Sequence, residues 1–116
     1  MAAKRVILEM GTGNDLHGGD YTKAAVRAVQ DAIHHSSLPL IRTLGLAARA
    51  MQVDVTIGVQ QPDKVDAEMV KRALPHGQVG IKIVKGGLDV PDKDSGDTAV
   101  IASAAVAVRL DLPQAK

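Results

Sequence analysis

The stretch EMGTGNDLHGGDYTKAAVRAV (residues 9–29) joins a strand-like run to a helix-like run and contains four glycines. Before it, KRVILEM (residues 4–10) is apolar and β-branched, as in a buried strand. After Asp20, a favoured N-cap residue, apolar residues recur at helical spacing. The sequence therefore predicts a strand that stops at Gly11, a glycine-rich corner over residues 11–20, and a helix that starts at about Tyr21.

This corner has two interpretations. Glycines permit positive φ and let a ligand approach the backbone, and the free N–H groups at a helix start attract an anion or a carbonyl oxygen. On that interpretation ligand contacts come from Gly11, Gly13, Asn14, Asp15, Asp20 and Thr22, with a further one from Gly96 of a later turn. On the other, the corner is a turn in which Asp15 and Asp20 only cap the helix. The sequence leaves both open.

Nucleotide and metal sites are less well supported at the corner. GTGNDL (residues 11–16) starts like a dinucleotide-binding fingerprint, but Leu16 stands where that motif needs Gly or Ala, and no Gly-Lys-Ser/Thr follows. Asp15, His17 and Asp20 are close enough in sequence to share a metal ion, yet they lack a strict ligand spacing. We expect no metal and no cofactor.

A second polar segment, DKDSGDT (residues 92–98), places Ser95 before Gly96 on a turn. An exposed serine can act as a nucleophile if a base activates it. Lys82 and Lys85 on the preceding strand are the candidate bases, with His17 as a further one. The alternative is an ordinary Ser-Gly turn and solvated strand lysines.

Three further strands are indicated by pattern. VDVTIGV (53–59) alternates between apolar and polar or small residues, and QVGIKIVKGG (78–87) ends in two glycines. TAVIASAAVAVRLDL (98–112) is rich in alanine, which favours helix, whereas its Val and Ile favour strand. A period of two is the better fit and predicts a long strand, because one parity is shared by Val100, Ala102, Ala104, Val106, Val108 and Leu110. We expect a loop over residues 88–97.

Two further helical segments complete the pattern. The first, at about 40–51, begins after Pro39; the second, at 63–74, is capped by Asp63 and directs Val65, Met69 and Ala73 inward. The order β-α(α)-β-α-β-β predicts a single α+β domain over residues 1–116, with helices on one face of a mixed sheet.

Composition indicates how the sheet's second face is covered. The chain has 116 residues, with no Phe, no Trp and one Tyr, so its core consists of small aliphatic side chains that each bury little area. We therefore expect another copy of the chain to cover or complete the sheet.

Charge and composition also exclude several classes of partner. The 14 basic and 13 acidic residues are mixed along the chain, and rings for base stacking are nearly absent, so we expect no nucleic acid. No apolar run is long enough to span a membrane, and the absence of cysteine excludes disulfide and thiolate chemistry. These features predict a cytoplasmic protein.

The segment ILEMGTGNDLHGGDYTKAAVRAVQDAI (7–33), the later SGD (95–97) and the Val/Ala-rich strand resemble a family of short bacterial proteins of unassigned function, over nearly the whole chain. More remotely, the chain is similar to one repeat of the ring-opening amidohydrolases, cyanuric acid hydrolase and barbiturase. The matching positions are Gly13 and Asn14 in the glycine turn, Asp20, Tyr21 and Thr22 at the helix start, and Ser95 and Gly96 in the serine turn. Those repeats carry a lysine just before the glycine turn, where this sequence has Met10, Gly11 and Thr12.

Because the hydrolases join three such units around a pseudo-threefold axis, the resemblance implies a homotrimer of single units. It implies a small polar metabolite bound at subunit interfaces, where the glycine corner and the Ser95 turn of different copies converge. Hydrolysis of a cyclic amide would then use Ser95, activated by Lys82 or Lys85 in place of the missing lysine. The alternative function is a non-catalytic oligomer that binds a small ligand or is purely structural.

Overall fold

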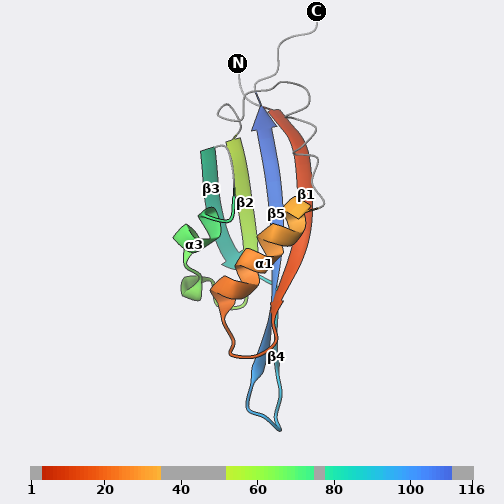
Figure 1. Cartoon of the computed structure of the whole chain (residues 1–116), viewed down its shortest axis with the longest axis vertical. Helices are drawn as coiled ribbons and strands as arrows, with labels where there is room; N and C mark the ends of the chain where they lie inside the picture. The colour runs from red at the N-terminus through yellow and green to blue at the C-terminus, as the bar shows by residue number, and fades with distance from the viewer. Residues whose placement is uncertain (1–3, 35–51, 75–77, 111–116) are drawn as a thin grey trace, which may run out of the picture.

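The computed structural model describes residues 4–34, 52–74 and 78–110 (Figure 1). In chain order the elements are β1 (Lys4–Asp15), α1 (Tyr21–His34), β2 (Gln52–Val59), the 3₁₀ turn η2 (Pro62–Lys64), α3 (Ala67–Lys71), β3 (Gln78–Lys85), β4 (Leu88–Pro91) and β5 (Thr98–Leu110). The helix expected at about 40–51 lies outside the described residues.

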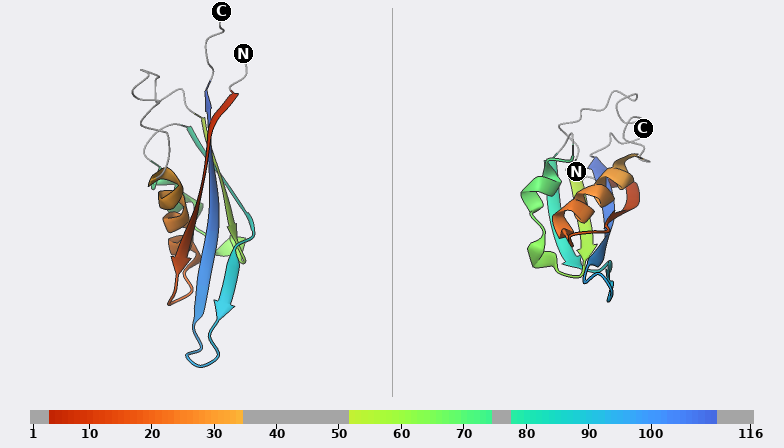
Figure 2. Two further views of the ribbon diagram at one scale, coloured as in Figure 1. Left: turned by 90° about the vertical axis from the view of Figure 1, so that its right-hand side faces the viewer. Right: turned by 60° about the horizontal axis from the view of Figure 1, so that its bottom comes forward.

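The five strands of the described residues form one mixed sheet in the order β1-β5-β2-β3, with β4 also paired to β5. Strand β5 runs antiparallel to β1, β2 and β4, whereas β2 and β3 are parallel. Figure 2 shows α1 and α3 on the same side of this sheet. The predicted α+β fold, with helices on one face of a mixed sheet, is confirmed.

The long strand β5 is the centre of the core. Its buried side chains share one parity, as the sequence predicted: Val100, Ala102, Ala104, Val106, Val108 and Leu110. They face α1, whose buried residues are Tyr21, Thr22, Ala24, Ala25, Ala28, Val29 and Ala32. The core therefore lies between α1 and β5, and the odd-numbered residues of β5 point to the opposite face of the sheet.

The first strand does not stop at Gly11, and this corrects the predicted corner. Gly11 and Gly13 lie inside β1, paired with Ala104 and Ala102 of β5. A Cβ atom on Gly11 would lie 2.5 Å from the carbonyl oxygen of Ala28, and one on Gly13 would overlap the backbone of α1 in the same way. These two glycines let the helix pack directly on the strand backbone. Positive φ is confined to Gly18, Gly19, Gly87 and Gly96 among the described glycines.

The predicted loop at 88–97 contains a strand, which is the second correction. After β3 the chain crosses the end of β2 at Gly86 and Gly87, and β4 then pairs with Thr98–Ile101 of β5. Gly87 has a φ of 62°, and a Cβ there would lie 2.9 Å from the Gly58 carbonyl oxygen. The β4–β5 hairpin extends beyond the rest of the sheet (Figure 1).

The helix expected at 63–74 is shorter and differently capped. Residues Pro62–Lys64 form η2, Val65 is extended, and α3 begins after Asp66, whose side chain accepts from the N–H groups of Glu68 and Met69. Val70 is the buried residue of α3, while Met69 is 50% exposed, so the inward face predicted through Met69 is wrong. Asp66, and not Asp63, is the N-cap of α3, because its own backbone is extended while its side chain accepts from the second and third N–H groups of the helix.

None of the helices in the described ranges has the length and hydropathy required to cross a lipid bilayer. The predicted cytoplasmic location stays a prediction.

Candidate functional site

The two carboxylates of the corner cap α1. Asp15 is buried, and its Oδ2 accepts from the Asp20 N–H at 2.8 Å, while Oδ1 of Asp20 accepts from the Lys23 N–H at 3.0 Å. Lys23 Nζ and a guanidinium nitrogen of Arg27 lie 4.0 and 3.8 Å from Asp15 Oδ1. These contacts match the second interpretation of the corner, in which Asp15 and Asp20 stabilise a turn and the start of the helix. The ligand-binding roles of Asp15 and Asp20 stay predictions.

Thr22, another predicted ligand contact, joins helices within the chain. Its hydroxyl accepts from the Asp66 N–H at 2.9 Å and donates to the Lys64 carbonyl at 3.4 Å. Thr22 thus fixes the start of α1 to the η2–α3 segment.

The corner and the serine turn meet in a single chain through Asp97. The Gly18 N–H donates to Asp97 Oδ1 at 3.1 Å, and His17 Nδ1 lies 3.3 Å from Asp97 Oδ2. The Gly18 hydrogen bond and then His17 hold the pKa of Asp97 below its ordinary value. Sequence reasoning missed Asp97, although an aspartate next to a Ser-Gly turn is a common acceptor for loop N–H groups. Within the described ranges, no cluster of three His, Asp or Glu side chains could hold a metal ion.

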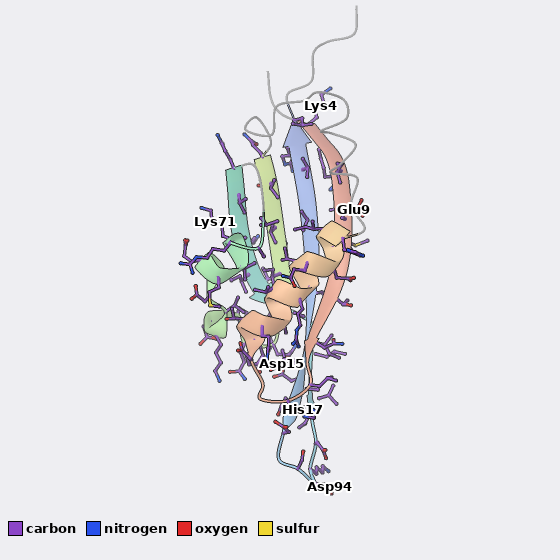
Figure 3. The ribbon with its side chains drawn as sticks, viewed as in Figure 1. Lys4, Glu9, Asp15, His17, Lys71 and Asp94 are labelled. Carbon is purple, nitrogen blue, oxygen red and sulfur yellow. The ribbon has the colours of Figure 1, made fainter. Side chains whose placement is uncertain are left out.

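Ser95 stabilises the hairpin turn. Its Oγ donates to Asp92 Oδ2 at 3.0 Å and accepts from the Asp97 N–H at 3.2 Å, and Gly96 adopts a φ of 73°. Asp92 has a pKa below its ordinary value, chiefly because it accepts from the Asp94 N–H and then from Ser95. Figure 3 shows Asp94 at the far tip of the hairpin. The hydroxyl of Ser95 is thus engaged in an ordinary turn.

Neither candidate lysine lies near Ser95 in one chain. Lys82 pairs with Thr56, which pairs with Ala105, seven residues along β5 from Thr98. At about 3.3 Å per residue, this places Lys82 about 23 Å beyond the start of β5, and the same register places Lys85 about 13 Å beyond it. Ser95 lies further still, before Thr98. The Ser–Lys pair does not form within a single chain.

A polar cluster that sequence reasoning missed lies at the start of α1. The buried Tyr21 donates its hydroxyl to Asp89 Oδ2 at 2.5 Å and accepts from Gln61 Nε2 at 2.9 Å. The hydrogen bond to Asp89, followed by burial, raises the pKa of Tyr21. Asp89 Oδ1 is buried without a hydrogen-bond partner among the described residues. These residues are up to 68 positions apart, so no local pattern connects them.

The face of the sheet away from the helices, called here the open face, carries a hollow of about 510 Å³. It is lined by Met10, Gly11, Thr12, Asp31, Thr56, Gly58, Ser103, Ala104 and Ala105. Strand register places Thr12 beside Ser103 and Ser103 beside Gly58, with Thr56 beside Ala105 in the next row. Three hydroxyl groups from three strands therefore surround a depression left by glycine and alanine.

Large apolar side chains flank the hollow on the open face. Met10 is 73% exposed and Leu8 45% on one side, and Leu88 is 59% exposed and Val90 49% on the other. Their strand partners on β5 are Ala105, Ala107, Ile101 and Ala99, respectively. Such a grouping of exposed apolar side chains is typical of an interaction surface.

Side chains of α1 occupy two backbone groups near the end of β1. Asp31 Oδ2 accepts from the Thr12 N–H at 3.0 Å, and Arg27 donates to the Asn14 carbonyl at 2.6 Å. These bonds occupy backbone groups to which another strand would bind.

Comparison with other proteins identifies the family. Residues 5–108 match the model of the conserved hypothetical protein family Lin0512_fam. The chain belongs to this family. It is also similar to an FtsZ-like protein of unknown function from Nostoc punctiforme, whose crystal structure superposes with a TM-score of 0.83 at 38% identity and covers 97% of this chain and 99% of that one.

The curated proteins gave no match. The predicted membership of an uncharacterised family of short proteins is confirmed. The remote resemblance to ring-opening amidohydrolases stays a prediction.

Proposed function

We propose that this protein is a homo-oligomer that binds a small polar molecule in the hollow of its open face, between copies. The observation that carries this function is the hydroxyl-lined hollow on a sheet face that α1 and α3 leave bare, with exposed Leu8, Met10, Leu88 and Val90 around it. The activity proposed is binding, without a chemical step.

The open face is large enough for a stable contact with a second copy. The 13 residues of β5 extend about 43 Å. Strand β1 on one side of β5, and β2 followed by β4 on the other, give a width of about 15 Å. The projected area of about 600 Å² approaches the roughly 800 Å² per partner of a standard interface before side-chain relief is added. A second copy on this face would also bury further apolar area, which a core of small aliphatic side chains supplies sparingly.

The edges of the sheet favour association through the face. Asp31 and Arg27 occupy backbone groups of the β1 edge, and the edge strand β3 carries Lys82 and Lys85. Charged and covered edges oppose the addition of another strand. On the open face, by contrast, Met10 and Leu88 are exposed apolar side chains.

The chemistry of the hollow favours a small neutral polar ligand. Thr12, Thr56 and Ser103 supply hydroxyls that both donate and accept, while Met10 and Ala105 supply apolar contacts. The carboxylate of Asp31 already accepts from the Thr12 N–H. A second copy over the hollow would exclude water and complete the enclosure that small-molecule sites require.

Binding is favoured over amide hydrolysis because Ser95 is held in its turn and Lys82 lies about 23 Å beyond the start of β5. A hydrolase of the type implied by the resemblance would need a lysine from another copy next to Ser95. The hydroxyl groups of the hollow, by contrast, already lie together within one chain.

Light scattering and thermal shift test this function with two matched variants. Met10→Lys places a charge on the open face, whereas Met69→Lys places one on the 50%-exposed Met69 of α3. We expect the wild type and Met69→Lys to be oligomers that gain melting temperature with a ligand from a panel of small neutral amides, ureides and polyols. Met10→Lys should be monomeric and lose that gain. A wild type that is monomeric at micromolar concentration, or a Met10→Lys variant that assembles normally, would overturn the proposal.

A further inference from the structure

We infer that two copies associate through their open faces about a two-fold axis at Ser103, so that Leu8 and Met10 of one copy pack on Leu88 and Val90 of the other. This inference rests on the proposed function and specifies the partner surface.

The strand register places the large apolar side chains evenly about Ser103. Met10 and Leu8 lie two and four residues along β5 in one direction, opposite Ala105 and Ala107. Leu88 and Val90 lie two and four residues in the other direction, opposite Ile101 and Ala99. At about 3.3 Å per residue, both pairs stand about 7 and 13 Å from the Ser103 row.

The two pairs also lie on opposite sides of β5. Ile101 pairs with Asn14 of β1 and with Leu88 of β4, so β4 lies across β5 from β1. The apolar side chains therefore form a diagonal centred on Ser103. A two-fold axis in the interface plane, through Ser103 and perpendicular to this diagonal, exchanges its two ends.

In an isologous contact of this kind, the Leu8–Met10 pair of each copy packs on the Leu88–Val90 pair of the other, so the same contact occurs twice per dimer. Between them, the central row holds Ser103 of β5 and Gly58 of β2, while Ala105 and Ile101 of β5 lie in the rows of Met10 and Leu88. Small side chains at the centre and large ones at both ends give two surfaces that can approach each other closely.

The axis also joins the two hollows. Each hollow is lined by Ser103, so at the axis the hydroxyls of Thr12, Thr56 and Ser103 from both copies surround one chamber. The expected stoichiometry is one ligand for two chains, and the ligand is a small polar molecule with donors or acceptors on two opposite sides.

A charge-pair cycle tests the axis. Met10→Asp and Leu88→Lys each place an unpaired charge in the interface and should weaken dimerisation at least tenfold. The double variant Met10→Asp/Leu88→Lys places opposite charges together across the axis, twice per dimer, and should recover affinity to within about threefold of the wild type. Both positions are largely exposed in one chain, so folding should be preserved.

The controls separate this axis from a general charge effect. Met10→Asp/Leu88→Asp should remain monomeric, and Met10→Asp/Met69→Lys should be as weak as Met10→Asp alone, because Met69 lies on α3. Sedimentation equilibrium of the wild type should give two chains. A wild-type dimer without recovery in the double variant, or a trimeric mass, overturns the axis and leaves the proposed binding function standing. A monomeric wild type overturns both.

Discussion

Gly11 of β1 and Ala28 of α1 approach so closely that a Cβ on Gly11 would lie 2.5 Å from the Ala28 carbonyl oxygen. Two residues along β1, Gly13 meets the same helix in the same way. The glycines of the motif therefore set the distance between α1 and the sheet. The direct consequence is that the sheet's helix-covered face near Gly11 and Gly13 has no room for a ligand.

Gly11→Ala should destabilise the protein by about 3 kcal/mol or more, because the methyl group meets helix backbone that cannot move aside. The melting temperature should fall by about 10 °C or more in a thermal scan. The matched control is Gly80→Ala on β3, where a Cβ would make an ordinary 3.8 Å contact with Asp54. Equal losses in the two variants would contradict the packing role of Gly11.

Tyr21→Phe should cost about 1–3 kcal/mol of unfolding free energy, because it removes the hydroxyl that donates to Oδ2 of Asp89. Asp89 Oδ1 already has no partner among the described residues. Adding Asp89→Asn to Tyr21→Phe should recover part of the loss, since the charge is removed. Urea unfolding of the two variants measures this, and a double variant less stable than Tyr21→Phe alone would refute it.

The sequence predicted the elements whose pattern is local. In β5, alternate burial from Val100 to Leu110 follows from a period of two that is visible in the chain itself. In α1, Asp20 caps the first turn as its residue type predicts. These elements depend on neighbours within a few residues.

The sequence misled where a residue type has two uses. Gly18 and Gly19 adopt a positive φ, which glycine allows. Gly11 and Gly13 are needed because they have no Cβ to collide with α1, and the sequence alone does not show where α1 lies. Strand β4 is formed by pairing across a hairpin, and its four residues carry too little pattern of their own.

The candidate site was harder to predict than the fold. Asn14 and Ser95 matched a family motif, but the hollow is assembled from β1, β2 and β5 by register. Thr56 and Ser103 are ordinary strand residues in sequence and become neighbours of a hollow only in the sheet. Likewise, Tyr21 and Asp89 carry no motif that joins them.

Above pH 10, the pKa of Tyr21 gives a defined dependence of stability on pH. Its hydrogen bond to Asp89 raises the folded-state pKa above the ordinary value of about 10, so the folded state holds the proton more tightly than the unfolded state. The stabilisation is complete below pH 10 and is lost as pH rises through the folded pKa. Melting temperatures from pH 8 to 11 should fall more steeply for the wild type than for Tyr21→Phe. Parallel curves would show that Tyr21 does not contribute.

Asp97 should give the opposite dependence at acid pH. The Gly18 N–H and His17 lower its pKa in the folded state, so its stabilising contribution is present above the ordinary aspartate value of about 4 and is lost as pH falls through the folded pKa. Asp97→Asn should therefore flatten the fall of melting temperature between pH 5 and 2.5. Some slope should remain, because Asp92 has a lowered pKa from its own bonds to Asp94 and Ser95. Asp94→Asn serves as the control, since the contact of Asp94 with Asp92 comes from its backbone N–H, which the substitution keeps. If Asp97→Asn and Asp94→Asn change the acid limb equally, the contact between the loop at Gly18 and the hairpin turn does not hold the two segments together.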